Sequence, residues 1–384
     1  MPPLSTCHRQ LNIRRWAPLP SQLKMTANHA KRRRAVHREL EQRKLACLLV
    51  THPANWFYLT GFTGDSGALV ISRDGATLLT DGRFTVQASQ ETSGLHIELQ
   101  KGALFTATGD LLRRKGWNRA GYDPSQLTVA QLQAIQKAAG SKWKGIDARS
   151  LVSALRMQKD PQELSVMRKA AILAGEALES VLPMLKPGIR ESEVAAEIEY
   201  QMRERGADGA SFETIVASGP RGALPHARPT AKKLRKNELV VLDLGAILGH
   251  YCSDMTRTVF LGRASRKVRN WYSAVLEAQQ AAIARVEAGV TCGEVDAAAR
   301  EVLKKHHLEA FFVHSTGHGL GLEVHEEPRI ARGQETRLQA GNVITIEPGV
   351  YVEGAGGIRI EDDVVVHAGR SEVLTRVKRD LIEL

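Results

Sequence analysis

Cysteine and long apolar runs are both scarce in this sequence of 384 residues. The four cysteines form no C-x-x-C pair and are not spaced like a zinc knuckle, so we expect reduced thiols in a cytoplasmic protein. They are Cys7, Cys47, Cys252 and Cys292. No apolar stretch approaches the roughly 20 residues that span a bilayer, so we expect no membrane partner.

Basic residues are concentrated at the N-terminus. Residues 1–44 hold 11 Lys and Arg against two Glu, which accounts for +9 of the formal net charge of +11 and leaves +2 for the rest. A nucleic-acid enzyme spreads basic surface around its site, so this distribution predicts no nucleic-acid partner. We interpret residues 1–24, which lack the apolar core of a secretory signal, as a basic, disordered tail. A transit segment, or a true start at Met25, fits the composition as well.

Residues 25–157 alternate helical and strand patterns, which predicts an α/β domain. The expected helices are Ala30–Lys44 and Thr128–Ala139. The expected strands, two of them joined by a turn at residues 73–75, are Ala46–Val50, Ala68–Ser72, Ala76–Thr80 and Lys144–Ala148.

A second domain is expected from residue 158 to residue 384. Pro161 opens a helix that should run to about Leu185, and a second helix should span Glu191–Arg205. Three residues of this region recur 101 positions later: Gly188, Glu193 and Val194 return as Gly289, Glu294 and Val295. In both copies two helices precede two or more strands. This predicts a duplicated α-α-β-β unit, folded as a pseudo-two-fold α+β domain.

Acidic residues interrupt two predicted hairpins of this domain. The strands Leu239–Ile247 and Tyr251–Leu261 flank a Gly-containing turn. If Leu248 and Gly249 form that turn, Asp243 lies directly opposite Asp254.

The second hairpin repeats the arrangement. Its strands Val343–Val352 and Gly357–Val366 would place Glu347 opposite Glu361. Like charges across a strand pair are destabilising, and carboxylates are costly among apolar neighbours. Two divalent cations, about 3.5–4 Å apart and bridged by oxygen ligands, would compensate both pairs. The alternative is a solvated face on which the acids pair with Lys or Arg.

Three histidines lie in loops that suit a site. His318 stands in the glycine-rich Gly317–Gly321 segment, where the backbone can approach closely, and we interpret it as the nitrogen ligand of the metal pair. A phosphate cradle would need a following G-K-[ST], which is absent. His325 begins the string His-Glu-Glu-Pro, and His226 lies in a turn-rich loop. Both are candidates for substrate contact, although loop histidines are more often ordinary.

This set of residues predicts metal-assisted hydrolysis. Two cations that share a water lower its pKa, and the hydroxide attacks a carbonyl. An imidazole stabilises the oxyanion, and Glu347 accepts the proton. Carboxylates with one imidazole favour Mn²⁺ ahead of Co²⁺, Fe²⁺ or Zn²⁺.

Six strings of residues resemble those of the Xaa-Pro peptidases, aminopeptidase P and prolidase, which have the "pita-bread" metallopeptidase fold. The strings are Leu242–Gly245, Cys252–Thr258, Gly317–Gly321, His325–Pro328, Ile346–Gly349 and Ile358–Asp362. The resemblance, which extends from about Met25 to the C-terminus, implies a pita-bread catalytic domain behind an N-terminal α/β domain of the creatinase type.

The resemblance also implies roles for individual residues. Asp243 and Asp254 would bind one metal, His318 and Glu347 the other, with Asp254 and Glu361 bridging. His226 and His325 match substrate-contacting histidines, and Arg359 matches a site arginine. The N-terminal domain would mediate a homodimer, and residues 55–62 would form part of the substrate entrance.

The resemblance leaves the peptide length open. We expect an aminopeptidase P-like enzyme that cleaves the Xaa-Pro bond at the N-terminus of peptides. The alternative is a prolidase restricted to Xaa-Pro dipeptides, which must recognise a free carboxylate, for example through Arg83, Arg221 or Arg359. A methionine aminopeptidase-like enzyme or a non-catalytic binding protein of the same fold are more distant alternatives.

Overall fold

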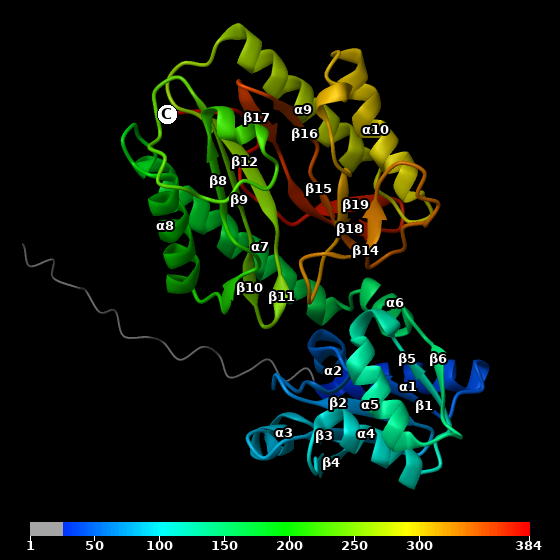
Figure 1. Ribbon diagram of the computed structural model, residues 1–384. Helices are drawn as coiled ribbons and strands as arrows, with labels where there is room; N and C mark the ends of the chain where they lie inside the picture. The colour runs from blue at the N-terminus through cyan, green and yellow to red at the C-terminus, as the bar shows by residue number, and fades with distance from the viewer. Residues whose placement is uncertain (1–25) are drawn as a thin grey trace, which may run out of the picture.

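Residues 26–384 are described by a computed structural model, in which the chain forms two units (Figure 1). The interpretation of residues 1–24 as a tail therefore lies outside the described residues. In Figure 1 the N-terminal unit lies at the bottom and the larger C-terminal unit at the top. Among the described helices, none has the length and apolar character needed to cross a membrane.

The N-terminal unit is built on a six-stranded mixed sheet in the order β4-β3-β2-β1-β5-β6. Its strands are β1 (Cys47–Val50), β2 (Ala68–Ser72), β3 (Gly75–Thr80), β4 (His96–Leu99), β5 (Arg119–Tyr122) and β6 (Lys144–Asp147). Its helices are α1 (Thr26–Gln42), α2 (Pro53–Thr60), α3 (Thr85–Glu91), α4 (Leu104–Arg114), α5 (Val129–Ala139) and α6 (Leu151–Met157). The expected α/β pattern is confirmed, and every residue of β1 and β2 is buried because the sheet lies between apolar clusters.

Part of the basic run near the N-terminus has a structural role in α1. Arg32 and Arg33 are buried, and their guanidinium groups donate to the carbonyl oxygens of Tyr58 and Leu59 at the end of α2. Basic side chains at a helix C-terminus satisfy carbonyls that have no partner within the helix. These two charges are therefore structural, which no charge count reveals.

The units are joined at α7 (Pro161–Val181). This helix begins with a capping box in which Asp160 accepts from the backbone of Glu163 and Glu163 accepts from that of Asp160. Arg32 of the N-terminal unit forms ion pairs with both acids, at 2.9 and 3.0 Å. A single buried arginine thus ties α1 to the start of the second unit.

The C-terminal unit contains the predicted duplication. The first half carries α7 and α8 (Glu191–Glu204), and the second carries α9 (Arg266–Arg285) and α10 (Cys292–Lys305). Before α8, Gly188 donates to the carbonyl of Leu234, and before α10, Gly289 donates to the carbonyl of Leu338, with both glycines at positive φ. The same turn thus occurs at equivalent points of both halves.

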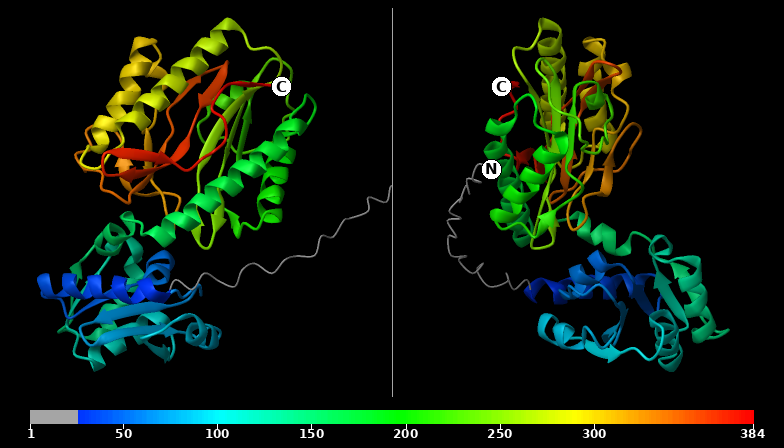
Figure 2. Two further views of the ribbon diagram at one scale, coloured as in Figure 1. Left: turned by 180° about the vertical axis from the view of Figure 1, so that it is seen from behind. Right: turned by 60° about the vertical axis from the view of Figure 1, so that its left-hand side comes forward.

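Strands of both halves lie between the two helix pairs (Figures 1 and 2). A four-stranded sheet has the order β20-β12-β9-β8, and a five-stranded sheet has the order β14-β13-β15-β18-β19. Their strands are β8 (Ile215–Ser218), β9 (Leu239–Leu244), β12 (Met255–Phe260), β20 (Ile382–Glu383), β13 (Gly317–Gly319), β14 (Glu326–Ile330), β15 (Val343–Ile346), β18 (Asp362–His367) and β19 (Arg370–Val373). The small strands are β7 (Gly209–Ala210), β10 (Ala246–Leu248), β11 (Tyr251–Cys252), β16 (Gly349–Val352) and β17 (Gly356–Arg359).

The predicted register of the first hairpin is wrong by two residues. The turn is Gly249-His250, both with positive φ, and Leu248 pairs with Tyr251. Asp243 therefore faces Thr256 rather than Asp254. Because side chains alternate with a period of two, a two-residue shift leaves both acids on the same face.

The predicted register of the second hairpin is confirmed. Ile346 pairs with Asp362, and Gly349 pairs with Arg359, so Glu347 and Glu361 lie opposite each other between the two ladders. Each predicted strand is broken there, into β15 and β16 on one side and β17 and β18 on the other. The two acids occupy this interruption.

Candidate metal centre

The predicted acids of both hairpins converge where the two halves meet. Glu361 donates its backbone N–H to the carbonyl of Thr256 on β12, which brings the second hairpin against the first. One ligand atom from each of Asp254, His318 and Glu361 lies within 4.8 Å of the others. These three residues come from separate strings of the sequence and form the centre of the site.

Asp243 and Glu347 flank this central group. The Oδ1 atom of Asp243 is buried without a hydrogen-bond partner among the described residues. Glu347 Oε1 lies 3.4 Å from His318 Nε2 and accepts from the Thr345 hydroxyl at 3.3 Å. A buried acceptor with no partner is costly, and a cation would remove that cost.

The carboxylates repel one another. Burial, followed by repulsion from Glu361 and Asp243, raises the pKa of Asp254 well above its ordinary value. Burial also raises the pKa of Glu361 well above its ordinary value, with repulsion from Glu347 and Asp243 adding to it. The pKa of Glu347 rises to about 7, mainly by burial. Neighbouring acids whose pKa values are raised in this way are costly to ionise together. Divalent cations bound between them would compensate the negative charge.

His318 is oriented to act as a ligand. Its Nδ1 is 2.9 Å from the carbonyl oxygen of Gly319, which can only accept, so the proton lies on Nδ1. Nε2 is left with its lone pair directed toward Asp254 and Glu347, at 3.7 and 3.4 Å. Burial lowers the pKa of His318, which keeps the imidazole neutral. Metal-binding histidines typically have this arrangement.

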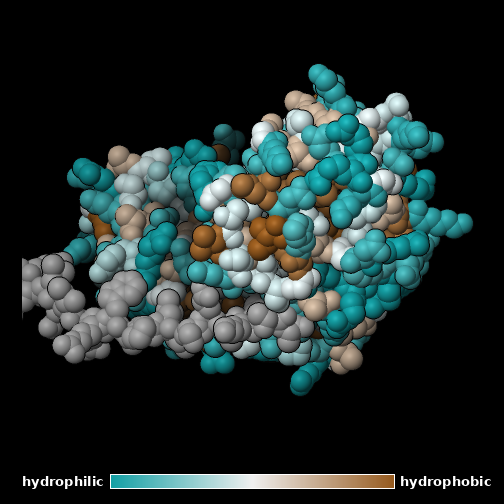
Figure 3. All heavy atoms as spheres, turned by 90° about the horizontal axis from the view of Figure 1, so that it is seen from below, coloured by the Kyte–Doolittle hydropathy of each residue, from teal (hydrophilic) through white to brown (hydrophobic). Residues whose placement is uncertain are grey.

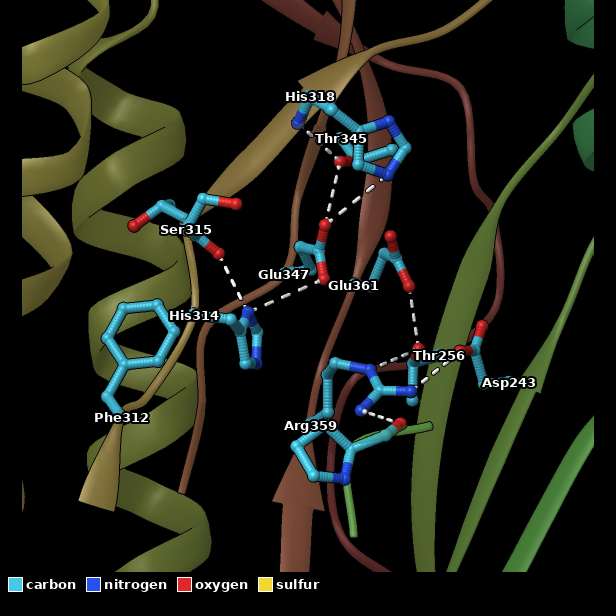
Figure 4. Close-up of polar contacts among 12 residues, drawn as sticks. Asp243, Thr256, Phe312, His314, Ser315, His318, Thr345, Glu347, Arg359 and Glu361 are labelled. Atoms are coloured by element: carbon cyan, nitrogen blue, oxygen red, sulfur yellow. Dashed lines mark hydrogen bonds and ion pairs between the residues drawn. The ribbon is translucent and has the colours of Figure 1, made fainter. Parts of the chain in front are cut away.

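Arg359 connects the site to its polar surroundings (Figure 4). Figure 4 shows its Nη2 directed at Asp243, to whose Oδ2 it donates at 2.6 Å. Its Nη1 donates to the Tyr351 hydroxyl at 2.7 Å. Its Nε donates to the Thr256 hydroxyl at 3.0 Å, and that hydroxyl donates to Glu361 at 2.6 Å. The arginine expected at the site is therefore present and holds one of the acids.

His226 and His325 line the same cavity, which has a volume of about 660 Å³. Both residues are exposed. The His325 ring centroid is 4.3 Å from that of His318. Neither side chain makes a hydrogen bond within the part of the chain that the structure describes, so both are available to a ligand.

His314 also lines the cavity and was missed by the sequence analysis. Its Nε2 is 2.8 Å from the Tyr351 hydroxyl, and its Nδ1 is 2.8 Å from the Ser315 carbonyl and 3.8 Å from Glu347 Oε2. Figure 4 shows His314 and His318 on opposite sides of Glu347. Burial lowers the pKa of His314 to about 4. No glycine-rich motif surrounds His314, so only its position four residues before His318 could have indicated it.

The expected entrance segment lies elsewhere. Residues 55–60 lie in α2 and residues 61–62 follow it, and none of them lines the cavity. The N-terminal side of the cavity is instead lined by Ser153 and Arg156 of α6. Arg156 binds Asn55 of α2 together with Glu323 and Glu326, and thereby connects α2 to the cavity.

Four arginines line the cavity, and three of them have carboxylate partners. Arg156 binds Glu323 and Glu326, Arg228 binds Glu213, and Arg359 binds Asp243. Arg329 forms no ion pair with any of the described residues. The other two arginines considered from the sequence are outside the cavity and paired, Arg83 with Asp81 and Arg221 with Glu191.

Residues 165–368 match metallopeptidase family M24, and residues 32–158 match the creatinase/prolidase N-terminal domain. The sequence is similar to the Xaa-Pro dipeptidase of Pyrococcus furiosus, with 35% identity over 89% of this chain and 97% of that protein. The structure is similar to a Xaa-Pro dipeptidase from Bacillus anthracis, with a TM-score of 0.90 and 36% identity over 93% of this chain and 100% of that one.

The structure is also similar to that of an X-Pro aminopeptidase from Thermotoga maritima, with a TM-score of 0.86 and 34% identity over 92% of this chain and 99% of that one. The expected combination of a pita-bread unit and a creatinase-type N-terminal unit is confirmed.

Proposed function

The chain belongs to metallopeptidase family M24, and on this premise we propose that it is an Xaa-Pro dipeptidase. This is the prolidase alternative, in place of the aminopeptidase P-like enzyme expected from the sequence. The names of the similar proteins favour it, although one of them is an aminopeptidase. The observation that carries the proposal is that Arg329 lines the cavity and forms no ion pair with a described residue.

The reasoning rests on what a dipeptidase must exclude. An enzyme that accepts only Xaa-Pro dipeptides has to recognise the free α-carboxylate of the proline, and an arginine pairs with a carboxylate through two parallel hydrogen bonds. Arg329 is exposed to the cavity and has no competing acid among the described residues, whereas the other cavity arginines are engaged. We therefore assign the substrate carboxylate to Arg329.

We propose that five residues hold two divalent cations, with Mn²⁺ the first candidate. They are Asp243, Asp254, His318, Glu347 and Glu361. The unpartnered Asp243 oxygen, the raised pKa values of the other acids and the neutral imidazole support this assignment. Cations held there supply Lewis acidity, which activates water as a nucleophile and stabilises charge on the substrate carbonyl.

The chain's own residues complete the proposed mechanism. Glu347, a carboxylate that lines the cavity, is placed to take a proton from the attacking water and return it to the leaving proline nitrogen. His226 and His325 are positioned to contact the substrate, and Arg359 keeps Asp243 in place.

Several wider assignments are proposals of the same kind. We place the boundary between the two domains at residues 157 and 158. A homodimer through the N-terminal domain is supported by apolar side chains gathered on the underside of the molecule (Figure 3), where that domain lies, and by exposed Val86 and Leu99. A cytoplasmic location is supported by Cys47, Cys252 and Cys292, which are free, buried thiols.

Three substrates test the proposal: Ala-Pro, Ala-Pro amide and Ala-Pro-Ala, each with added Mn²⁺. We expect cleavage of Ala-Pro and a loss of at least about 100-fold in kcat/KM for the other two, because each leaves Arg329 without its partner. Arg329→Gln should remove the preference, whereas Arg228→Gln should not, since Arg228 is occupied by Glu213. Efficient cleavage of Ala-Pro-Ala by the natural protein would instead support the aminopeptidase.

A further inference from the structure

Glu191 and Asp296 are fully buried acids, one in each half of the C-terminal unit. They accept hydrogen bonds from the loops that carry His226 and His314. Resting on the proposed function, we propose that Glu191 and Asp296 are positioning residues that hold these two histidines in place for the substrate. Neither acid touches the cavity, and neither belongs to the candidate metal ligands.

Glu191 binds both ends of the His226 loop. Its Oε1 accepts from the backbone N–H of Ser218 at 2.9 Å and from the Ser218 hydroxyl at 2.7 Å. Its Oε2 accepts from the backbone N–H of Thr230 at 3.1 Å and from the Thr230 hydroxyl at 2.7 Å. Arg221, inside the loop, donates to the same Oε2 at 3.1 Å. One carboxylate thus closes an eleven-residue loop between residues 218 and 230 that contains His226 near its middle.

Asp296 holds the His314 segment in the second half. Its Oδ1 accepts from the Thr316 hydroxyl at 2.8 Å, and its Oδ2 accepts from Arg300 Nε at 2.7 Å. Arg300 in turn donates to the carbonyl of His314 at 2.6 Å and stacks on the Phe312 ring at 4.3 Å. The backbone on both sides of the His314 side chain is therefore fixed from α10.

The two acids occupy related places in the duplicated unit. Glu191 lies in α8 and Asp296 in α10, which are equivalent helices. By the 101-residue offset, Asp296 corresponds to position 195, one helical turn after Glu191 and on the same face. In each half, therefore, a carboxylate on the same face of the second helix binds the loop that carries a cavity histidine.

The chemistry explains why these residues are carboxylates. Each oxygen of Glu191 accepts from a backbone N–H and a hydroxyl. An amide at this position would replace one oxygen by an NH₂ group, which would face a backbone N–H and could not accept its hydrogen bond. A buried carboxylate is tolerated only when such donors surround it, and these bonds lower the pKa of Glu191 against the opposing effect of burial. Glu191→Gln keeps the volume and breaks at least one end of the loop.

The first test is a double-mutant cycle measured as kcat/KM on Ala-Pro. We expect Glu191→Gln to lower kcat/KM by roughly 10- to 100-fold. In a His226→Ala background the same substitution should cost less than about threefold, because its effect passes through that histidine. In a His314→Ala background, Glu191→Gln should lower kcat/KM by the same factor as in the natural protein. Asp296→Asn should show the reverse pattern.

The second test is hydrogen exchange of the backbone amides in the metal-free protein, which needs no activity. Glu191→Gln should speed exchange in residues 219–230 and leave residues 312–318 unchanged, and Asp296→Asn should do the opposite. Glu193→Gln and Glu294→Gln are matched controls, since they alter exposed acids of the same two helices. If Glu191→Gln fails to fold, Thr230→Val removes one of the five bonds and should give the same pattern at smaller amplitude.

Equal costs in the matched and crossed backgrounds, or exchange that rises throughout the chain, would overturn the positioning role. If the natural protein fails to cleave Ala-Pro but the local exchange pattern holds, the proposed function fails and the positioning of the loops stands.

Discussion

Removing metal should make the stability of this protein fall as pH rises, and this effect can be estimated from Glu347. Its pKa lies at about 7 in the folded protein, against 4.5 as the ordinary value. The folded state therefore holds this proton more tightly than the unfolded state, and stability is lost as pH rises from about 4.5 to about 7. At about 1.4 kcal/mol for each pKa unit, Glu347 alone costs the metal-free protein about 3 kcal/mol at pH 8.

Asp254 and Glu361 act in the same direction, because their pKa values are also raised. Bound cations need these groups ionised, so metal should stabilise the protein more at pH 8 than at pH 5. The difference in melting temperature between protein with Mn²⁺ and protein with EDTA should widen by at least roughly 4 °C between these pH values. Differential scanning calorimetry at both pH values measures it. Other titrating groups cancel, since they are common to both samples.

Asp254→Asn is the matched variant. It removes one of the repelling charges while keeping the shape, so at pH 8 its metal-free form should be more stable than the metal-free natural protein. Addition of Mn²⁺ should no longer stabilise it, and its peptidase activity should be lost. The mutual repulsion on which the metal assignment rests would be refuted by one result. In the natural protein, the difference in melting temperature between the Mn²⁺ and EDTA samples would be the same at pH 5 and pH 8.

Two further predictions concern the surroundings of the site. His314→Ala should lower kcat/KM without moving either limb of the pH–rate profile between pH 5.5 and 9, because burial holds the pKa of His314 at about 4 and keeps it neutral there; a limb that moves would contradict this. Gly317→Ala should destabilise the protein by several kcal/mol in urea unfolding, since a Cβ there would lie 1.9 Å from the Thr345 carbonyl oxygen. Gly82→Ala, which has no neighbour within 4 Å, should change stability by less than about 0.5 kcal/mol. Equal effects of the two glycine substitutions would remove the steric argument.

Short-range physics determined much of this protein from its sequence. The expected hairpin and the alternation of side chains along its strands put Asp243 and Asp254 on one face, so that even an error of two residues in the register left them together. Pro161 marked the start of α7, and the recurrence of Gly188 as Gly289 indicated the duplicated unit. These signals depend on neighbours within a few residues or on regular periods, which a sequence displays directly.

Tertiary structure decided the features that depend on distant partners. Arg32 links the two units because it forms an ion pair with Asp160, which lies 128 residues further along the chain. Arg359 is engaged because Asp243 lies 116 residues away, whereas Arg329 is left for a ligand because no acid of the described chain reaches it. His314 joins the site through Tyr351, and Glu191 reaches His226 only by closing its loop. Charge and hydrogen-bonding capacity can be read from a residue type, but whether they are used within the protein or offered to a substrate depends on what the fold places next to them.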